Sequence, residues 1–138
     1  MADDLKHVDP ELVAALQNFP PFVLSDDIIE AVRQGFNEMT KANPLGASAA
    51  AAAEAATAKA PDGYDVPIFI HKPQAAATGK RAGLLFIHGG GYIFGEAFMS
   101  GPSCRAQADA ADLVIVAVDY RLAPENPHPI PVEDCYAA

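Results

Sequence analysis

Three consecutive glycines after an apolar run are the residues of this sequence best suited to chemistry. His88-Gly89-Gly90-Gly91 directly follows the apolar run Gly83–Ile87. Glycine lets a backbone approach a ligand closely and turn its N–H groups outward. A phosphate and the oxyanion that develops during acyl transfer are the two ligands that need such a row of donors. A tight turn that holds no ligand is the third interpretation of the same residues.

The phosphate interpretation fits these residues poorly. Phe94 stands where the third glycine of a dinucleotide-binding fingerprint belongs, and Glu96 stands where a phosphate-binding loop carries its lysine. A carboxylate at that place would repel phosphate. The oxyanion interpretation fits better, because a His-Gly-Gly-Gly loop after a strand supplies oxyanion donors in lipases and esterases.

A hydrolase of that type also needs a nucleophile, a base and an acid that orients the base. No serine has glycines two residues away on both sides, as the G-x-S-x-G nucleophile elbow requires. The serines are Ser25, Ser48, Ser100 and Ser103. We expect Cys104 and Cys135 to be small buried side chains rather than nucleophiles. The histidines predicted to lie on the surface rather than to act as bases are His7, His71 and His128.

Apolar runs and chain breakers predict the elements that position the glycine loop. Gly83–Ile87 and Leu113–Val118 are typical of strands covered on both faces, and residues 103–111 between them form a modest helix. A strand–helix–strand unit of this kind makes its two strands parallel. Ligands bind at the carboxyl ends of such strands, where His88–Gly91 and Asp119 fall. A strand over Val66–Ile70 contains Pro67, which suits an edge strand or a strand start, and a last helix begins near Pro131.

The segment before these strands is predicted to be helical. Asp9-Pro10 indicates the start of one helix, which ends at Pro20, and Ser25 indicates the start of another. Residues 47–61 are alanine-rich, and they favour either a helix or a flexible linker. The predicted organisation is therefore a helical segment over residues 1–46, a linker over 47–61 and an α/β core over 62–138.

Two motifs make a family resemblance specific. His88-Gly89-Gly90-Gly91-Tyr92, followed by Val118-Asp119-Tyr120-Arg121-Leu122-Ala123-Pro124-Glu125, resembles the hormone-sensitive-lipase group of α/β-hydrolases. The resemblance covers residues from about 62 to 138. It implies the N-terminal half of an α/β-hydrolase fold, with a mostly parallel sheet and flanking helices, and residues 1–46 would be cap helices. In the strand order of that group, the strand Leu84–Ile87 loses one neighbour here and becomes an open edge, which invites self-association.

The same resemblance implies roles for individual residues. The N–H groups of Gly90 and Gly91 would be the oxyanion donors, and His88 and Gly89 would shape the loop. The residues implied to be structural are Asp119, Tyr120, Arg121 and Glu125. The nucleophile, base and acid would lie beyond these motifs, so we expect a chain of this length to be inactive alone. The function implied is the N-terminal portion of a serine carboxylic-ester hydrolase acting on a small ester without a cofactor or metal, and the alternative is a non-catalytic relative that binds a ligand or partner.

Composition excludes several other classes of function. The chain has 138 residues, with 18 acidic and 9 basic side chains and a net charge of −9, so it offers no basic surface for nucleic acid or an anionic membrane. Residues of hydrophobic type make up 51%, which is enough for a packed core, yet no run approaches the roughly 20 apolar residues of a membrane span. Asp3 and Asp4 stand where a secretory signal carries positive charge. We therefore expect a cytoplasmic protein.

Overall fold

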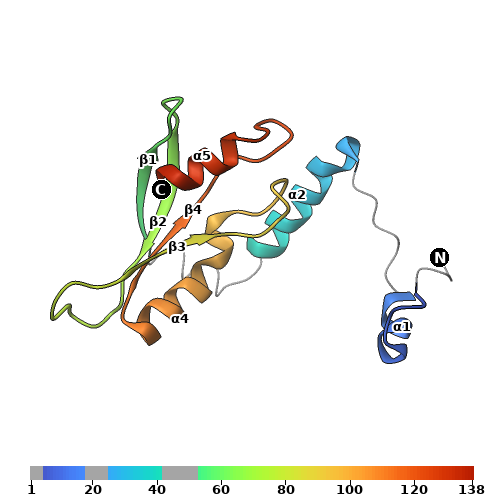
Figure 1. The fold of residues 1–138 in the computed structure, drawn as a ribbon, viewed down its shortest axis with the longest axis horizontal. Helices are drawn as coiled ribbons and strands as arrows, with labels where there is room; N and C mark the ends of the chain where they lie inside the picture. The colour runs from blue at the N-terminus through green and yellow to red at the C-terminus, as the bar shows by residue number, and fades with distance from the viewer. Residues whose placement is uncertain (1–4, 18–24, 42–52) are drawn as a thin grey trace.

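A four-stranded sheet of order β1-β2-β4-β3 forms the centre of the computed structural model, which describes residues 5–17, 25–41 and 53–138 (Figure 1). The strands are β1 (Glu54–Lys59), β2 (Asp65–His71), β3 (Gly83–Ile87) and β4 (Val114–Val118). The predicted parallel pairing of β3 with β4 is confirmed. Over the described residues the sheet is mixed rather than mostly parallel, because β2 runs opposite to both of its neighbours.

The alanine-rich segment joins the sheet. The prediction of a helix or linker over residues 47–61 is wrong for Glu54–Lys59, which forms β1, and residues 47–52 lie outside the described residues. A turn at 60–63, with Gly63 at a φ of +89°, folds β1 back against β2. Ala56 and Ala58 then pack on the core formed with β2. Strand pairing therefore overrides the helix propensity of alanine.

Pro67 lies in an interior strand, so the edge position considered for it is wrong, and it stands two residues after the start of that strand. It is the third residue of β2 and precedes Ile68, the first residue of β2 that pairs with β4. Its missing N–H therefore removes no hydrogen bond from the β2–β4 ladder. Its carbonyl still accepts a hydrogen bond from the Asp119 N–H at 3.0 Å.

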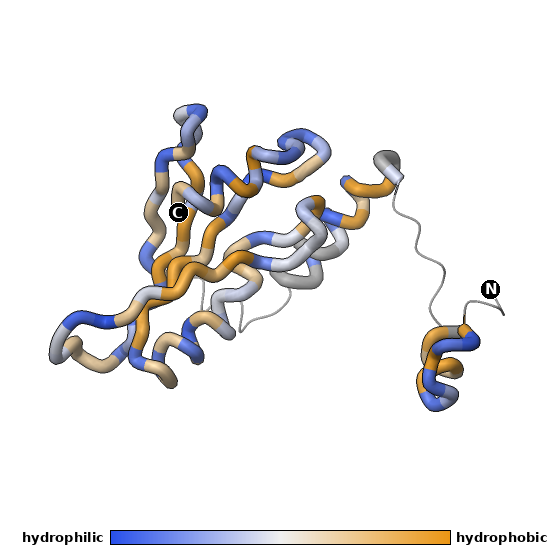
Figure 2. Tube along the Cα trace, in the orientation of Figure 1, coloured by the Kyte–Doolittle hydropathy of each residue, from blue (hydrophilic) through white to orange (hydrophobic). Residues whose placement is uncertain are grey.

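Helices cover both faces of the sheet. The short helix η1 (Ala97–Ser100) leads directly into α4 (Gly101–Ala111), and both pack on one face around Ile115 and Ala117. The helix α5 (Ile130–Ala137) packs on the other face, around Val118 and Tyr120. The strands β2, β3 and β4 between these helices are largely hydrophobic (Figure 2). A predicted two-sided core is therefore present, with alternate residues of each strand serving alternate faces.

The predicted N-terminal helices are α1 (Pro10–Gln17) and α2 (Asp26–Lys41). Asp9 caps α1 as predicted, since its carboxylate accepts the Glu11 N–H at 3.0 Å. α1 lies apart from the sheet, whereas α2 lies beside the loop that follows β3 (Figure 1). That these helices form a cap over a pocket stays a prediction. Among the helices of the described residues, none has the length and apolar character that a membrane crossing needs.

The strand β3 forms one edge of the sheet, next to β4. Leu84, Leu85 and Ile87 expose 38%, 42% and 51% of their surface. The apolar run therefore does not mark a strand covered on both faces within the described residues, because Leu84 on one face of β3 and Leu85 and Ile87 on the other are all exposed. The side of β3 away from β4 also has no neighbouring strand among the described residues.

Candidate active site

The loop after β3 is a tight turn closed by its own backbone. The Gly90 carbonyl accepts hydrogen bonds from the N–H groups of Ile93 and Phe94, at 3.1 and 3.2 Å. Gly90 and Gly91 have φ values of +136° and +59°, and Tyr92 follows at +65°. Within the described residues, neither the Gly90 nor the Gly91 N–H donates a hydrogen bond to the backbone. The turn thus directs a carbonyl inward and leaves two adjacent donors unused.

Two glycines of this loop are required by space as well as by conformation. A Cβ on Gly90 would lie 1.7 Å from the Phe94 carbonyl oxygen, and a Cβ on Gly95 would lie 2.6 Å from both the Gly89 oxygen and the His88 Nδ1. A Cβ on Gly91 would meet only Ile93, at 4.0 Å, so Gly91 is required by its φ alone. Sequence reasoning missed the role of Gly95, which the spacing of the glycines did not reveal.

His88 is buried beneath the loop rather than presented to solvent. Its Nδ1 lies 2.9 Å from the Gly89 carbonyl, so Nδ1 carries the proton and donates it. Its ring stacks on Tyr120 with 4.2 Å between ring centroids, and the Tyr120 hydroxyl donates to the His88 carbonyl at 2.8 Å. Burial raises the pKa of Tyr120, which keeps this donor protonated. These contacts agree with a shaping role for His88 and a structural role for Tyr120.

The segment after β4 is hydrogen-bonded to the loop and to the start of η1. The Ala123 N–H donates to the Tyr92 carbonyl at 2.8 Å, and the Asp119 carboxylate accepts the Ala97 N–H at 2.7 Å. Asp119 therefore anchors the start of η1, which agrees with the structural role that the resemblance implies for it. The carboxyl ends of β3 and β4 meet at this edge, as predicted for parallel strands.

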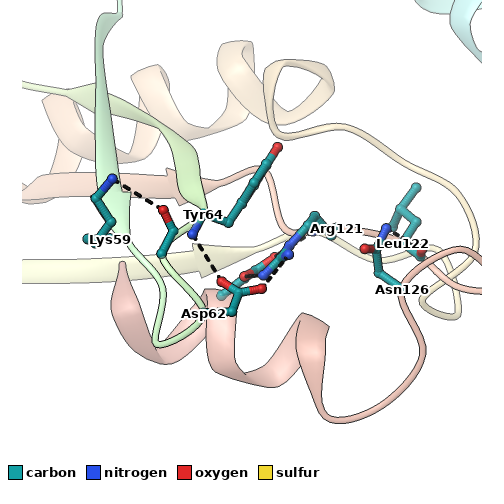
Figure 3. A network of polar contacts seen from close by, with 8 residues as sticks. Lys59, Asp62, Tyr64, Arg121, Leu122 and Asn126 are labelled. Atoms are coloured by element: carbon teal, nitrogen blue, oxygen red, sulfur yellow. Dashed lines mark hydrogen bonds and ion pairs between the residues drawn. The ribbon is translucent and has the colours of Figure 1, made fainter.

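Arg121 joins three elements behind the loop. Its guanidinium and its own N–H donate to the fully buried Asp134 of α5 at 2.7 to 3.0 Å, and its Nη1 donates to Asp62 at 2.7 Å. The guanidinium also lies 4.2 Å from the ring centroid of Tyr64. Figure 3 shows Asp62 and Tyr64 of the β1–β2 turn gathered around Arg121. These two carboxylates raise the pKa of Arg121, so its charge is permanent.

Two cavities in the described part of the chain border residues 88–92 of the loop. One, of about 270 Å³, is lined by residues 88–90 and 94–96 together with Met99 and Ser100. The other, of about 280 Å³, lies between Tyr92 and the start of α5 and is lined mainly by apolar groups, with His128 at its wall. A small organic group has room on either side of the glycines.

The described residues bring no nucleophile and base together. Ser103 accepts a hydrogen bond from Gln107, and burial raises the pKa of Cys104 and of Cys135, which keeps both thiols protonated. The expectation of a buried cysteine is confirmed for Cys104, and Cys135 is half-buried. No group of three His, Cys, Asp or Glu side chains in the described part of the chain is placed to hold a metal ion.

One histidine prediction is wrong. His7 and His128 are exposed as expected, but His71 exposes only 1% of its surface, because its position in β2 turns its ring into the face covered by α4. Neither ring nitrogen has a hydrogen-bond partner among the described residues, and burial lowers the pKa of His71. His71 is a neutral core side chain, and it lies on β2 rather than at the glycine loop.

Comparisons with known proteins place this arrangement in a family. Residues 84–138 match the family model described as alpha/beta hydrolase fold. Esterase LipI of Mycobacterium tuberculosis is 34% identical over 140 residues, which cover 99% of this chain and 42% of that protein. Arylacetamide deacetylase of Oryctolagus cuniculus is 43% identical over 76 residues, covering 54% of this chain and 19% of that protein.

Solved structures agree with the sequence comparison. A bacterial heroin esterase superposes with a TM-score of 0.72 at 34% identity, covering 94% of this chain and 40% of that one. A hyperthermophilic esterase from the archaeon Pyrobaculum calidifontis gives a TM-score of 0.68 at 29% identity, with the same coverage. Nearly the whole of this chain matches these three esterases, but it spans only about two fifths of their length. Over that length it belongs to the alpha/beta hydrolase fold family.

Proposed function

We propose that this chain is the N-terminal part of a carboxylic-ester hydrolase and that Gly90 and Gly91 supply its oxyanion hole. The observation that carries the proposal is the turn at Gly90, whose carbonyl is occupied twice while the two glycine N–H groups are left without a backbone acceptor in the described residues. In ester hydrolysis, the carbonyl oxygen of the substrate becomes an alkoxide in the tetrahedral intermediate. Fixed backbone donors stabilise that charge without reorganising during the reaction.

The shape of the loop supports this role for its donors. Gly90 can have no side chain, and the loop is held by Tyr120 beneath it and by Ala123 beside it. Donors fixed in this way favour the transition state over the substrate, because the charge that they contact appears only during the reaction. The adjoining cavities of about 270 and 280 Å³ suit a small ester.

The remaining chemistry needs a serine nucleophile with its base and acid, which the described residues do not assemble. We therefore expect this chain alone to give no ester turnover above background. Its exposed β3 edge would associate with other copies, since an apolar strand with an unpaired side pairs readily.

The test begins with the transcript, read in frame for about a hundred codons past the codon for Ala138, since serine elbows in this fold follow the next helix and strand. A G-x-S-x-G motif there supports the proposal, and the longer protein is then assayed with a short p-nitrophenyl ester. Changing Gly91→Ala should lower kcat by about tenfold to a hundredfold and leave KM nearly unchanged, because misplaced donors weaken only transition-state binding.

Gly79→Ala is the matched control, since a Cβ at Gly79 meets no atom within 4 Å and the residue precedes β3, whereas the glycine loop follows it. Unchanged kcat in both variants would contradict the oxyanion role. A stop codon directly after Ala138 would overturn the proposal and favour a binding protein. Ester turnover by the 138-residue chain that survives Gly91→Ala would overturn it as well, because catalysis would then not depend on the glycine loop.

A further inference from the structure

One side chain of the N-terminal helical segment reaches into the backbone of the glycine loop. Arg33 of α2 is mostly buried, with 17% of its side chain exposed. Its Nε donates to the Ile93 carbonyl at 2.7 Å, and its Nη2 donates to the Ala123 carbonyl at 2.7 Å. These acceptors lie 60 and 90 residues along the chain from Arg33.

The two acceptors belong to the same small ring of hydrogen bonds. Ile93 is the residue whose N–H closes the turn onto Gly90, and Ala123 is the residue whose N–H holds the Tyr92 carbonyl. Arg33 thus donates to one carbonyl of the loop, that of Ile93, and to one carbonyl of the segment that supports the loop, that of Ala123. With Arg33 in place, the carbonyls of Gly90, Tyr92 and Ile93 all accept hydrogen bonds.

The guanidinium is held in this orientation by a carboxylate. Glu125 accepts from Nη1 at 2.6 Å and from Nη2 at 2.9 Å, a two-pronged contact that matches the planar fork of arginine. Arginine can meet a carboxylate and two carbonyls at once, because its five N–H donors lie in one plane. Lysine presents a single ammonium point and cannot reproduce the pattern.

We propose that Arg33 is a positioning residue that fixes the oxyanion loop, so that the order of the loop depends on the docking of helix α2. The role of Arg33 in catalysis rests on the function proposed above, but the dependence of the loop on the docking of α2 does not. Substrate never touches Arg33 in this scheme. The arginine acts through the Ile93 and Ala123 carbonyls, which set the orientation of the turn that presents the Gly90 and Gly91 donors.

Amide hydrogen exchange on the intact 138-residue chain, resolved to single amides by mass spectrometry, tests this coupling. The reporters are the Ile93, Phe94 and Ala123 amides, because each is protected by a hydrogen bond within the loop or to it. Arg33→Met and Arg33→Lys should both accelerate exchange at these amides by about tenfold or more, as expected for local opening. Amides of the interior strand β4 should keep their wild-type rates.

Arg105→Met is the matched control. Arg105 is similarly shielded, with 22% of its side chain exposed, and it also pairs with a carboxylate, that of Asp109 at 3.0 Å, but this partner lies on its own helix α4 rather than on the glycine loop. This variant should leave the loop amides unchanged.

Three results would overturn the proposal: full protection in Arg33→Lys, faster exchange in α2 alone, or an equal acceleration in the loop and in β4. The first would mean that a positive charge at residue 33 is enough to order the loop. The second would mean that Arg33 only anchors its own helix, and the third that it contributes to the stability of the whole fold. Because exchange is measured without substrate, a failure of the ester-hydrolase proposal would leave this result intact, and a failure here would leave the oxyanion assignment untouched.

Discussion

The two edges of the sheet are built from opposite kinds of residue. β1 presents small and charged side chains, and its ends are tied by ion pairs from Glu54 to Lys72 and from Lys59 to Asp65. β3 presents leucine and isoleucine, with Ile87 half exposed. Charge at an edge discourages pairing with another chain, and apolar side chains encourage it.

The composition of a strand therefore indicates whether it suits an edge or an interior position in a sheet. β1 is suited to be an edge, whereas β3 has the composition of an interior strand. The two sides also differ in how they are fastened. The β1 side is held by Arg121 on a fully buried carboxylate, and the β3 side carries the glycine loop, held by Arg33 on a carboxylate that is 58% exposed.

Of the changes considered, removal of the Arg121 side chain should lower the stability of the protein most, because it removes the contacts that hold the β1 side. Arg121→Met leaves the Asp134 carboxylate buried without its cation, which should lower the free energy of unfolding by about 3 kcal/mol or more. Urea unfolding followed by circular dichroism measures this loss. Asp62→Asn, which alters only the exposed partner, should cost much less, and equal losses in the two variants would show that Asp134 is not the main partner.

Alanine substitutions in the glycine loop test how strictly the β3 side requires glycine at each position. Gly90→Ala forces a Cβ against the Phe94 carbonyl in a strained backbone, and we expect it to cost at least about 2 kcal/mol of unfolding free energy. Gly91→Ala meets no close atom and should cost about 1 kcal/mol, the penalty of a left-handed residue. Urea midpoints of both variants check the order, and a larger loss at Gly91 would contradict the geometry of the turn.

Charging the β3 edge should remove its difference from β1. The double variant Leu85→Lys, Ile87→Lys should raise the dissociation constant of self-association by about tenfold or more, because a charged edge resists pairing. Sedimentation velocity over a concentration series measures this change. Ala55→Lys on the exposed face of β1 is the control and should change nothing, and a wild-type chain that stays monomeric throughout would contradict association through β3.

The smallest effect should come from the carboxylate that holds Arg33. Arg33 lowers the pKa of Glu125 from 4.5 to about 2, so the pair stabilises the fold fully above pH 4.5 and loses that contribution as pH falls toward 2. Glu125→Gln should therefore lower the Tm slightly at pH 7 and leave it unchanged near pH 2. A difference in Tm that grows on acidification would contradict this assignment.

The sequence predicted the parallel β3–β4 unit and the position of the glycine loop, because both depend on short apolar runs and on chain breakers that are local in the chain. It misjudged the strand Glu54–Lys59, since alanine carries no strand signal and the pairing with β2 decides its structure. It also placed His71 on the surface, because one strand residue does not reveal which face it serves.

The loop glycines and the arginines show the same limit within the candidate site. Gly90 and Gly91 stood out by their motif, but the need for glycine at Gly95 depends on contact with His88, which only the folded chain shows. Arg33 lies on a helix that was predicted from its start at Ser25, and its partners are 60 to 92 residues distant in the sequence. Contacts over such separations leave no local pattern.

The two cysteines lie on opposite faces of the sheet, Cys104 on α4 and Cys135 on α5. Each thiol is therefore a native reporter for one layer of the core. An alkylating reagent will modify Cys104 only when α4 lifts from the sheet, and Cys135 will become more reactive when α5 loosens. The ratio of the two labelling rates can thus show which layer opens first, without any engineered probe.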